Sequence, residues 1–380
     1  MKSLYRLLPV FIAFYCMGFV DIVGTAVNLA AADFNLNATH TQFLTSMIFL
    51  WFLIFSLPTG ILQERIGKKN VVLIALAVTI LAMLIPFFFY SYSIMLLGFA
   101  LLGIGNTIIQ VSLNPLLYDV SPEGSYSSNM SLSQFIKSVA AFFGPLLTVL
   151  FVDELGDWKF IFLAYGGLSL ITIVWLMFTS ITEKARKSKP AKITDCISLL
   201  GNRFVLLMVL GIFIVVGLDV GMNTGVPRFL EQFGLSPDKA VESISVFYIF
   251  SLMASRFLGA VVLKKISPRI FFIISAFLTI AGLILLTLGI NSILTKLAIV
   301  IIGLGSANIF PLIFSISVEK MPERSNEISG LMIMAISGGA IFPLIMGVII
   351  DHIGLTASIL FLLTVTLYLG FLSVKNLNHI

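Results

Sequence analysis

The stretch that decides the fold is GILQERIGKK, residues 60–69, a short charged turn between two long apolar runs. It sets one acidic and three basic residues around two glycines seven positions apart, with Pro58 just before it. The runs on its two sides, at 42–62 and 71–90, are long enough to cross a bilayer, which takes about 20 residues as a helix. The glycine spacing and the proline argue against an ordinary basic loop, so we interpret the stretch as a tight turn between membrane-spanning helices.

The composition extends this interpretation to the whole chain. Of its 380 residues, 59% are hydrophobic and 11% are charged, whereas an average soluble domain has about 25% charged residues. So few charges could not cover the surface of a water-soluble fold, which excludes soluble enzymes, secreted disulfide scaffolds and nucleic-acid-binding proteins. The net charge of +5 then reports membrane topology. The two cysteines, Cys16 in an apolar run and Cys196 in a basic loop, do not predict a disulfide.

Twelve apolar stretches of membrane-spanning length predict an all-α membrane protein with twelve transmembrane helices. The first stretch carries Asp21 near its middle and is too long for a cleaved signal peptide, so we expect it to belong to the fold. The stretches lie at 7–32, 42–62, 71–90, 94–118, 126–152, 160–182, 204–227, 242–263, 270–290, 294–318, 328–350 and 355–374.

The distribution of Lys and Arg predicts the side that each loop faces. An even number of spans puts both ends of the chain on one side, and the loops and tails of that side hold seventeen Lys and Arg residues against four on the other. Positive charges collect on the cytoplasmic side of membrane proteins. We therefore expect both termini in the cytoplasm and the chain in a bacterial-type inner membrane.

The chain divides into two similar halves. Its one long hydrophilic stretch, 183–203, predicts a cytoplasmic linker between six-helix bundles at 1–182 and 204–380. The halves match in the same order at an offset of about 198–200 residues, which indicates parallel repeats with a substrate site near the midplane where they meet. The matched pairs include Gly103 with Gly303, Gly105 with Gly305, Pro122 with Pro322, Pro145 with Pro343, and Asp21 with Asp219.

The turn at 60–69 resembles the loop motif G-x-L-x-D-R-x-G-R-K of the major facilitator superfamily, with Glu64 for the usual Asp and Lys68 for the usual Arg. The resemblance covers the whole chain and implies the major facilitator fold of two six-helix parallel repeats. It also implies that this loop locks the cytoplasmic side by charge pairing. The gating residues that follow from it are Gly60, Glu64, Arg65 and Gly67.

Within the superfamily, the chain is similar to the fucose–proton symporter group of glucose/galactose-type sugar transporters. The similarity lies in NIFPLIF at 308–314, in SGLMIMAISGGAIFP at 329–343, in Asn114-Pro115 and in Ser255-Arg256-Phe257. It implies proton-coupled uptake of a sugar. The group's span-four Glu corresponds to Gln110 here and its span-one Asp to Thr25, one turn from Asp21, so its proton chemistry does not carry over unchanged.

Polar side chains inside the apolar stretches are costly, so they mark the expected substrate path. Asn106, Gln110 and Asn114 recur every four residues and form one stripe, whose amides suit a polyhydroxylated ligand. Helix–helix hydrogen bonding is the alternative interpretation, and it is as good for Asn114, beside Pro115. Two aromatic residues are candidate stacking surfaces for a sugar ring. The predicted substrate-binding residues are Thr25, Asn28, Trp51, Asn106, Gln110, Asn223, Tyr248 and Asn308.

Four charged residues within spans need a functional or structural reason. Asp21 is predicted to couple proton movement, with Lys137 at a similar depth in span five as its charge partner, and a static ion pair is the alternative. Asp219, the repeat partner of Asp21, could carry the proton instead or bind substrate hydroxyls. Arg256 lies nearer the cytoplasmic end, where a gating or scaffold role is favoured over substrate contact.

The leading function is therefore secondary active transport, the proton-coupled uptake of a sugar by alternating access. An anionic sugar acid held by Lys137 or Arg256 is an open alternative. Drug efflux by proton antiport is disfavoured, because span four has no basic residue and Ala140 stands where efflux members have the first glycine of G-x-x-x-G-P. No metal site, nucleophile constellation or cofactor motif is found, so we expect no enzyme activity and no cofactor. The expected partners are the substrate, protons and the lipid bilayer, without nucleic acid, and the protein is expected to be a monomer.

Overall fold

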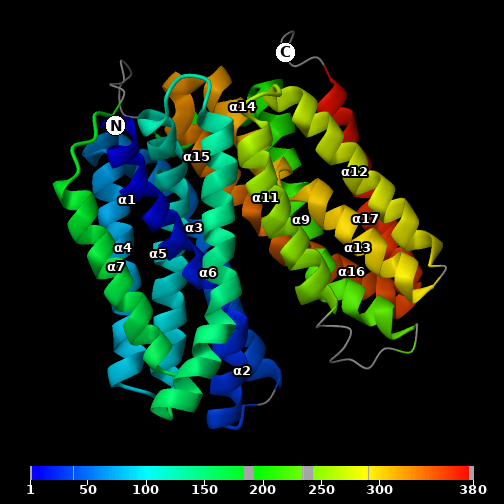
Figure 1. Ribbon diagram of the computed structural model, residues 1–380, viewed down its shortest axis with the longest axis horizontal. Coiled ribbons are helices and arrows are strands. Elements are labelled where there is room, and N and C mark those ends of the chain that lie inside the picture. The colour runs from blue at the N-terminus through cyan, green and yellow to red at the C-terminus, as the bar shows by residue number, and fades with distance from the viewer. Residues whose placement is uncertain are drawn as a thin grey trace. The chain divides into compact units, whose positions relative to one another are not determined.

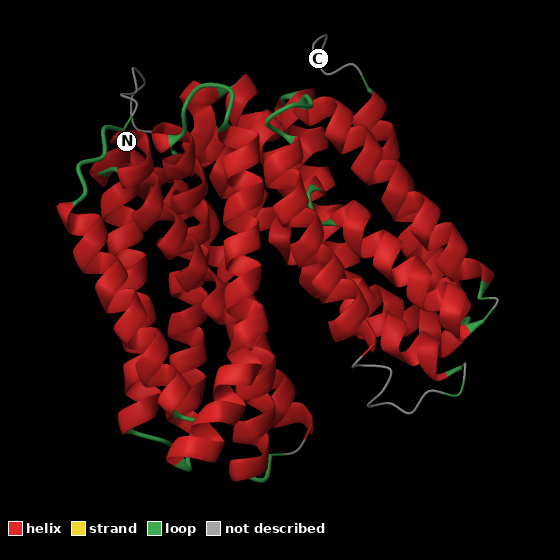
Figure 2. Cartoon of the chain, in the orientation of Figure 1, coloured by secondary structure: helices red, strands yellow, loops and turns green. Residues whose placement is uncertain are grey.

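The computed structural model describes residues 2–36, 38–183, 192–232, 234, 243–289 and 291–375, and within these the chain is helical, without a strand (Figure 2). Nine of the described helices are at least 18 residues long and apolar enough to cross a membrane, and shorter apolar helices lie at Tyr5–Val20 and Val246–Val262. Together the elements follow the predicted apolar stretches, so the prediction of an all-α, twelve-helix membrane fold is confirmed.

The first six membrane-spanning segments, here called rods, are long helices with one interruption. Helix α5 begins at a conventional cap, since the Ser91 hydroxyl accepts from the N–H of Ile94 at 3.4 Å, and α6 ends at Gly156, whose φ of 74° suits glycine. The elements are α1 (Lys2–Met17), the 3₁₀ turn η1 (Gly18–Ile22), α2 (Val23–Asp33), α3 (Ala38–Ile66), α4 (Lys68–Phe88), α5 (Tyr92–Val120), α6 (Tyr126–Leu155) and α7 (Phe160–Phe178).

The second six rods follow two short linker elements and contain more interruptions. Linker and second-half elements are α8 (Ile193–Ser198), η2 (Leu199–Gly201), α9 (Arg203–Glu231), the π turn η3 (Ile244–Ile249), α11 (Phe250–Val262), α12 (Pro268–Leu288), α13 (Ser292–Ser306), α14 (Ile309–Lys320), η4 (Pro322–Arg324), α15 (Ser325–Met334), η5 (Ala335–Ser337), α16 (Gly338–His352) and α17 (Leu355–Val374).

The repeat that the sequence predicts is confirmed in the packing of its glycines. A Cβ on Gly105 would lie 2.8 Å from the Thr79 hydroxyl, and a Cβ on Gly305 would lie 2.5 Å from the Thr279 hydroxyl. These two contacts are 200 residues apart at both partners. Because only glycine leaves room for so close an approach, each half uses the same residue to seat its fourth rod against its third.

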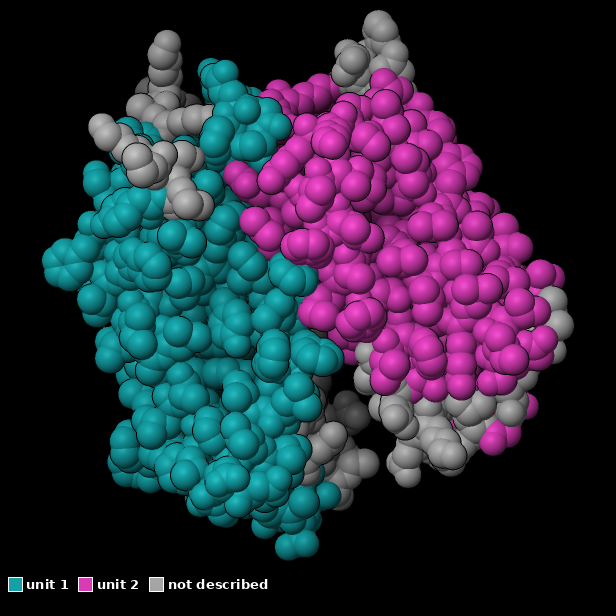
Figure 3. All heavy atoms as spheres, viewed as in Figure 1, with its two compact units in different colours: residues 1–126, 133–197, 321–334 teal, residues 127–132, 198–320, 335–380 magenta. Residues whose placement is uncertain are grey.

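By contacts, the described chain separates into two compact units (Figure 3). Unit 1 comprises 1–126, 133–197 and 321–334, and unit 2 comprises 127–132, 198–320 and 335–380. Each half of the sequence thus contributes the start of its fifth rod to the unit made mostly by the other half. Within unit 1, α4 lies beside α5 and α7 (Figure 1), and α15 packs against α3 and α5.

Several rods are broken where polar residues lie. The first rod changes to a 3₁₀ turn at Gly18–Ile22, which contains Asp21. The tenth is interrupted at Ala307 and Asn308, between α13 and α14, and the eleventh at Ala335–Ser337. Breaks release backbone groups that a membrane helix must satisfy in another way, so each needs a partner from a neighbouring rod.

Candidate functional site

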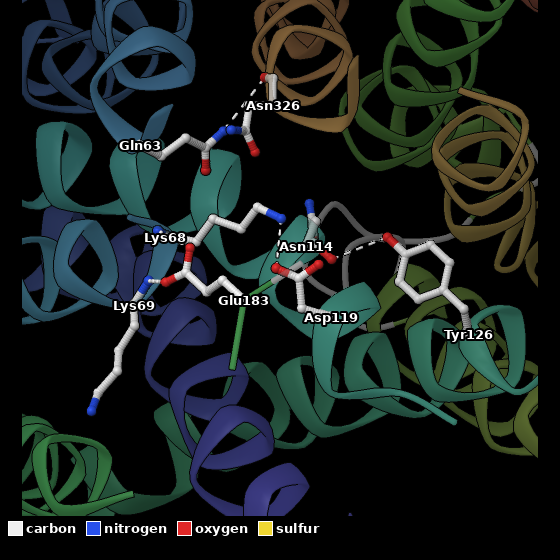
Figure 4. Close-up of polar contacts among 8 residues, drawn as sticks. All are labelled: Gln63, Lys68, Lys69, Asn114, Asp119, Tyr126, Glu183 and Asn326. Atoms are coloured by element: carbon white, nitrogen blue, oxygen red, sulfur yellow. Dashed lines mark hydrogen bonds and ion pairs between the residues drawn. The ribbon is translucent and has the colours of Figure 1, made fainter. Parts of the chain in front are cut away.

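The charged turn lies in unit 1 where α3 ends and α4 begins, a region here called the motif end. Figure 4 shows the polar contacts of this region. Gly67, the residue before α4, has φ of 87°, a conformation that favours glycine. The carboxylate of Glu183 accepts from the backbone N–H groups of Lys68 at 2.8 Å and Lys69 at 2.9 Å. A Cβ on Gly67 would lie 3.1 Å from this carboxylate. The second motif glycine therefore gives both the turn and the room for an acidic cap supplied from 115 residues away.

A buried ion pair joins α4 to the end of α5. Lys68 Nζ lies 2.6 Å from Asp119 Oδ2, with side-chain exposures of 6% and 1%. Each of these buried charges stabilises the other. Removing one partner of such a pair typically lowers the free energy of unfolding by about 3–5 kcal/mol. The resemblance implies charge pairing at this loop, and the acid that pairs with Lys68 is Asp119.

The same turn also binds the end of α7. Lys69 Nζ donates to the backbone carbonyls of Met177 at 3.0 Å and Thr179 at 2.9 Å. A cation is favourable at a helix C-terminus, where carbonyls lack intrahelical donors. Arg65 is exposed in the last turn of α3, where its charge has the same favourable sign.

Helix α15 closes over the motif end of α3. A Cβ on Gly60 would lie 3.0 Å from the carbonyl oxygen of Asn326, and a Cβ on Gly330 would lie 3.1 Å from the carbonyl oxygen of Ser56. Gln63 Nε2 also donates to the carbonyl of Asn326 at 3.4 Å. The first glycine of the motif is therefore a contact point between two helices, which a side chain would separate.

Linker helix α8 lies against this region. Its Cys196 is fully buried, and burial, with the nearby carboxylates of Glu327 and then Glu64, raises the pKa of the thiol to about 11. Glu64 is partly buried. Glu327 is 1% exposed and contacts Arg324 at 3.4 Å. The acid of the motif is thus one of the carboxylates near Cys196.

The predicted amide stripe of α5 forms a hydrogen-bonded row with the broken first rod. Gln110 Nε2 donates to Asn106 Oδ1 at 2.6 Å, and Asn106 Nδ2 donates to the carbonyl of Met17 at 2.7 Å. Met17 is the residue directly before the 3₁₀ turn, so Asn106 pairs a carbonyl at the break. Asn106 therefore has a structural partner in both directions, and Gln110 is the next amide along the row.

Lys137 lies beside the same break. A Cβ on Gly18 would lie 2.5 Å from the backbone oxygen of Lys137, so the turn that carries Asp21 packs directly against this part of α6. Asp21, Thr25 and Asn28 lie in η1 and α2 by their backbone, and their side chains fall outside the described part of the chain.

A second polar cluster lies in unit 2. Tyr248, which is fully buried, donates its hydroxyl to Asp219 Oδ1 at 2.8 Å, and its oxygen is 3.5 Å from the Ser306 hydroxyl. The π turn at 244–249 widens the rod where this tyrosine enters the core. Asn223, which is exposed, donates to the carbonyl of Asp219 in its own helix at 2.7 Å. The hydroxyl of Tyr248 thus belongs to the polar cluster, while its aromatic ring is buried.

Two more predicted residues support the break in the tenth rod. Asn308 Nδ2 donates to the carbonyl of Ser255 at 2.8 Å, and the Ser255 hydroxyl donates to the carbonyl of Leu304 at 2.6 Å. Arg256 Nε donates to the carbonyl of Ala307 at 3.4 Å. Ser255 and Arg256 of α11 thus contact the backbone around the interruption, and Asn308, which lies within it, donates back to α11.

Trp51, the other aromatic candidate, packs on α5. A Cβ on Gly103 would lie 2.8 Å from its ring, as a Cβ on Gly303 would lie 2.8 Å from Ser251 and 3.3 Å from Tyr248. The indole Nε1 is buried and has no hydrogen-bond partner among the described residues. At the repeat offset of 200 residues, Trp51 corresponds to Ser251 and Tyr248 to Ile48, so the two aromatic candidates lie beside equivalent glycines but at different positions.

Several residues of the site are absent from the site residues predicted from the sequence. Glu183 is the first residue of the predicted linker, and Asp119 directly follows the predicted span at 94–118. Both are acids at predicted helix ends near the basic turn, and pairing acids with bases across loops of the same side would have marked them as candidates. Ser255 and Ser329 are small hydroxyl residues, which are too common within membrane helices to stand out.

The sequence profile of the Major Facilitator Superfamily matches residues 10–343 of this chain. A glucose/galactose transporter of Brucella abortus biovar 1 is 27% identical over 354 residues, which cover 89% of this chain and 85% of that protein. A putative glucose/galactose transporter of Helicobacter pylori is 25% identical over 364 residues, which cover 91% of this chain and 89% of that protein.

Solved structures share the fold. The Escherichia coli fucose:proton symporter FucP superposes with a TM-score of 0.86 at 15% identity, covering 98% of each chain. The proton:xylose symporter XylE superposes with a TM-score of 0.77 at 14% identity, covering 97% of this chain and 94% of that one. With the profile match over most of its length and this fold, the chain belongs to the Major Facilitator Superfamily and is a multi-pass membrane transporter, not an enzyme.

Proposed function

We propose that this transporter takes up a sugar or sugar derivative together with protons, by alternating access between two six-helix halves at 1–182 and 204–380. The substrate class is supported by the relatives named as glucose/galactose transporters, which align with about nine tenths of the chain. Proton coupling is supported by the fold, which is shared with two sugar–proton symporters.

The observation that carries the proposal is the break in the first rod. Asp21 lies within the 3₁₀ turn, which packs on the backbone of Lys137 and is held through Met17 by Asn106. A carboxyl group in an irregular segment inside a membrane marks an ion pathway by default. Asp21 is our proton-coupling residue, Lys137 its charge partner and Gln110 the amide that we assign to sugar hydroxyls.

The cluster in unit 2 supplies a second group of candidate residues. Asp219 accepts from Tyr248, and Asn223 lies one turn further along the same helix. A carboxylate with a fixed donor is well suited to orient a substrate hydroxyl, so we assign Asp219 to substrate orientation and Asp21 to the proton. Trp51, Thr25, Asn28 and Asn308 remain candidates for further contacts.

We further propose a bacterial inner-membrane location, a monomer, and both termini in the cytoplasm. The excess of Lys and Arg on one side supports the orientation. The motif end, with its ion pair and the packing of α15 on α3, is then the cytoplasmic gate.

The test is uptake into proteoliposomes that contain the purified full chain, with an inward proton gradient and a panel of labelled neutral sugars, amino sugars and sugar acids. We expect accumulation of a neutral sugar that stops when a protonophore removes the gradient. Accumulation of sugar acids alone would favour the anionic alternative, and gradient-independent equilibration would remove proton coupling from the assignment.

A further inference from the structure

Pro115 leaves one carbonyl of α5 without its helical donor. In a regular helix, the carbonyl of Val111 would accept from the N–H of residue 115, but proline has no N–H. Val111 is fully buried, so water does not replace the missing donor at the surface. A buried carbonyl is costly to leave unpaired, and one must therefore look for another donor.

Helix α15 supplies that donor. The hydroxyl of Ser329, which is fully buried, donates to the carbonyl of Val111 at 2.6 Å across 218 positions of sequence. The bond exists only while α15 packs on α5. The packing of α15 on α5 and the pairing of the Val111 carbonyl therefore occur together.

The second half contains the same arrangement. Pro311 leaves the carbonyl of Ala307 without a helical donor, and Arg256 Nε donates to that carbonyl at 3.4 Å. In both halves, a proline in the polar rod creates an acceptor, and a side chain from another rod fills it.

The Val111 carbonyl, paired by Ser329, lies next to the hydrogen-bonded amides of Gln110 and Asn106. Val111 follows Gln110, whose amide bonds to Asn106, which in turn bonds to the carbonyl of Met17 at the broken first rod. Hydrogen bonds on the two sides of the Gln110–Val111 peptide thus connect α15 through α5 to Met17, which directly precedes the turn that contains Asp21.

We infer that Ser329 is a positioning residue that couples the docking of α15 to the geometry of Gln110, by donating to the Val111 carbonyl that Pro115 leaves free. The role of Gln110 in this inference rests on the proposed function, whereas the coupling between Ser329 and Pro115 does not. Without the Ser329 bond, α15 undocks more often and the backbone at Gln110 loses its fixed conformation.

The test is a double-mutant cycle on the purified full chain in detergent, with Cys16→Ser and Cys196→Ser as background and Asn326→Cys as probe. Asn326 is 1% exposed on α15, so its maleimide labelling rate reports undocking. We expect Ser329→Ala to raise labelling about five- to thirtyfold, the range for one lost buried hydrogen bond. In the Pro115→Ala background the new N–H pairs with Val111, and Ser329→Ala should then change labelling less than about twofold.

Two controls accompany the cycle. Ser329→Thr keeps the hydroxyl and should label like the parent. Ser317→Ala removes a hydroxyl bond to the Ile313 carbonyl, which retains its own helical donor, and should have no effect. The sugar readout is affinity by thermal shift, which should fall in Ser329→Ala and recover in Ser329→Ala with Pro115→Ala.

An unchanged labelling rate in Ser329→Ala, or an equal rise with and without Pro115, would overturn the inference. If Ser329→Ala does not fold, recovery of folding by Pro115→Ala supports the inference and failure to recover contradicts it. Normal labelling behaviour without any sugar binding would count against the proposed function alone.

Discussion

Gln110 lies at the end of a row in which each amide has a defined partner. Its Nε2 bonds to Asn106 Oδ1, while Asn106 is occupied by the carbonyl of Met17. Of the three amides in the stripe, Asn106 thus holds the broken rod and Asn114 lies fully buried, with neither amide atom bonded among the described residues. Gln110 is therefore the member of the stripe to which we assign substrate contact.

Gln110→Ala is expected to weaken sugar binding by about 1–3 kcal/mol, because a buried hydroxyl of the sugar loses its partner. Calorimetric titration of the purified protein measures this. Thr107→Val is the matched control, since its hydroxyl bonds only to the Gly103 carbonyl of its own helix in the hydrogen bonds described. Unaltered affinity in Gln110→Ala would remove Gln110 from the site.

Asp21→Asn should abolish gradient-driven accumulation while leaving exchange of labelled sugar measurable, because Asn imitates the protonated carboxyl. The parallel variant Asp219→Asn should weaken binding yet still concentrate sugar under a pH gradient. Proteoliposome uptake and counterflow separate the two effects. Accumulation in Asp21→Asn together with its loss in Asp219→Asn would reverse the two assignments.

At the scale of elements, the ends of α4 and α7 stabilise each other. Glu183, five residues after α7, caps the N-terminus of α4 (Figure 4). Lys69 from α4 caps the C-terminus of α7. Both charges have the sign that the helix dipole favours at their positions. This exchange holds the backbone of Lys68 while its side chain reaches Asp119.

Glu183→Ala should lower the free energy of unfolding by about 0.5–2 kcal/mol, the usual range for loss of an N-terminal cap. Glu183→Asp keeps the carboxylate and should recover part of the loss. Glu123→Ala removes an exposed acid from the α5–α6 turn and serves as control. Denaturant or thermal unfolding in detergent gives the comparison, and equal stability of Glu183→Ala and the control would contradict the capping role.

At the scale of the molecule, the linker at 183–203 has anchored ends. Glu183 caps α4 at one end and Cys196 is buried at the other, while residues 184–191 lie outside the described part of the chain. We expect the hydrophilic linker to be dispensable for the fold of each half, apart from Glu183 and Cys196, which belong to unit 1.

Lys189→Cys should resist labelling by an impermeant maleimide added outside intact cells, and should react once the cells are permeabilised. The reason is the cytoplasmic placement that the Lys and Arg distribution predicts. Asp157→Cys, in the short α6–α7 connection on the opposite side, is the positive control. Ready labelling of Lys189→Cys from outside would overturn the predicted topology.

The fold was accessible from sequence because the bilayer makes the pattern simple. Each crossing needs about 20 apolar residues, so the twelve rods could be counted. The repeat could be read because Gly103 and Gly105 recur as Gly303 and Gly305, at places where helices touch. The loop motif carried the family, and the polar residues within spans marked the candidate substrate path.

The partners of those polar residues were decided only by the tertiary structure. Nothing local joins Glu183 to the start of α4, Lys68 to Asp119, or Ser329 to the carbonyl of Val111. Hydrophobic length and spacing are properties of one segment, and the sequence by itself therefore determines which segments are helices and which faces are polar. Hydrogen bonds at breaks and termini join atoms far apart in the chain, because a membrane offers no water to satisfy them, and only the packed structure determines which atoms meet.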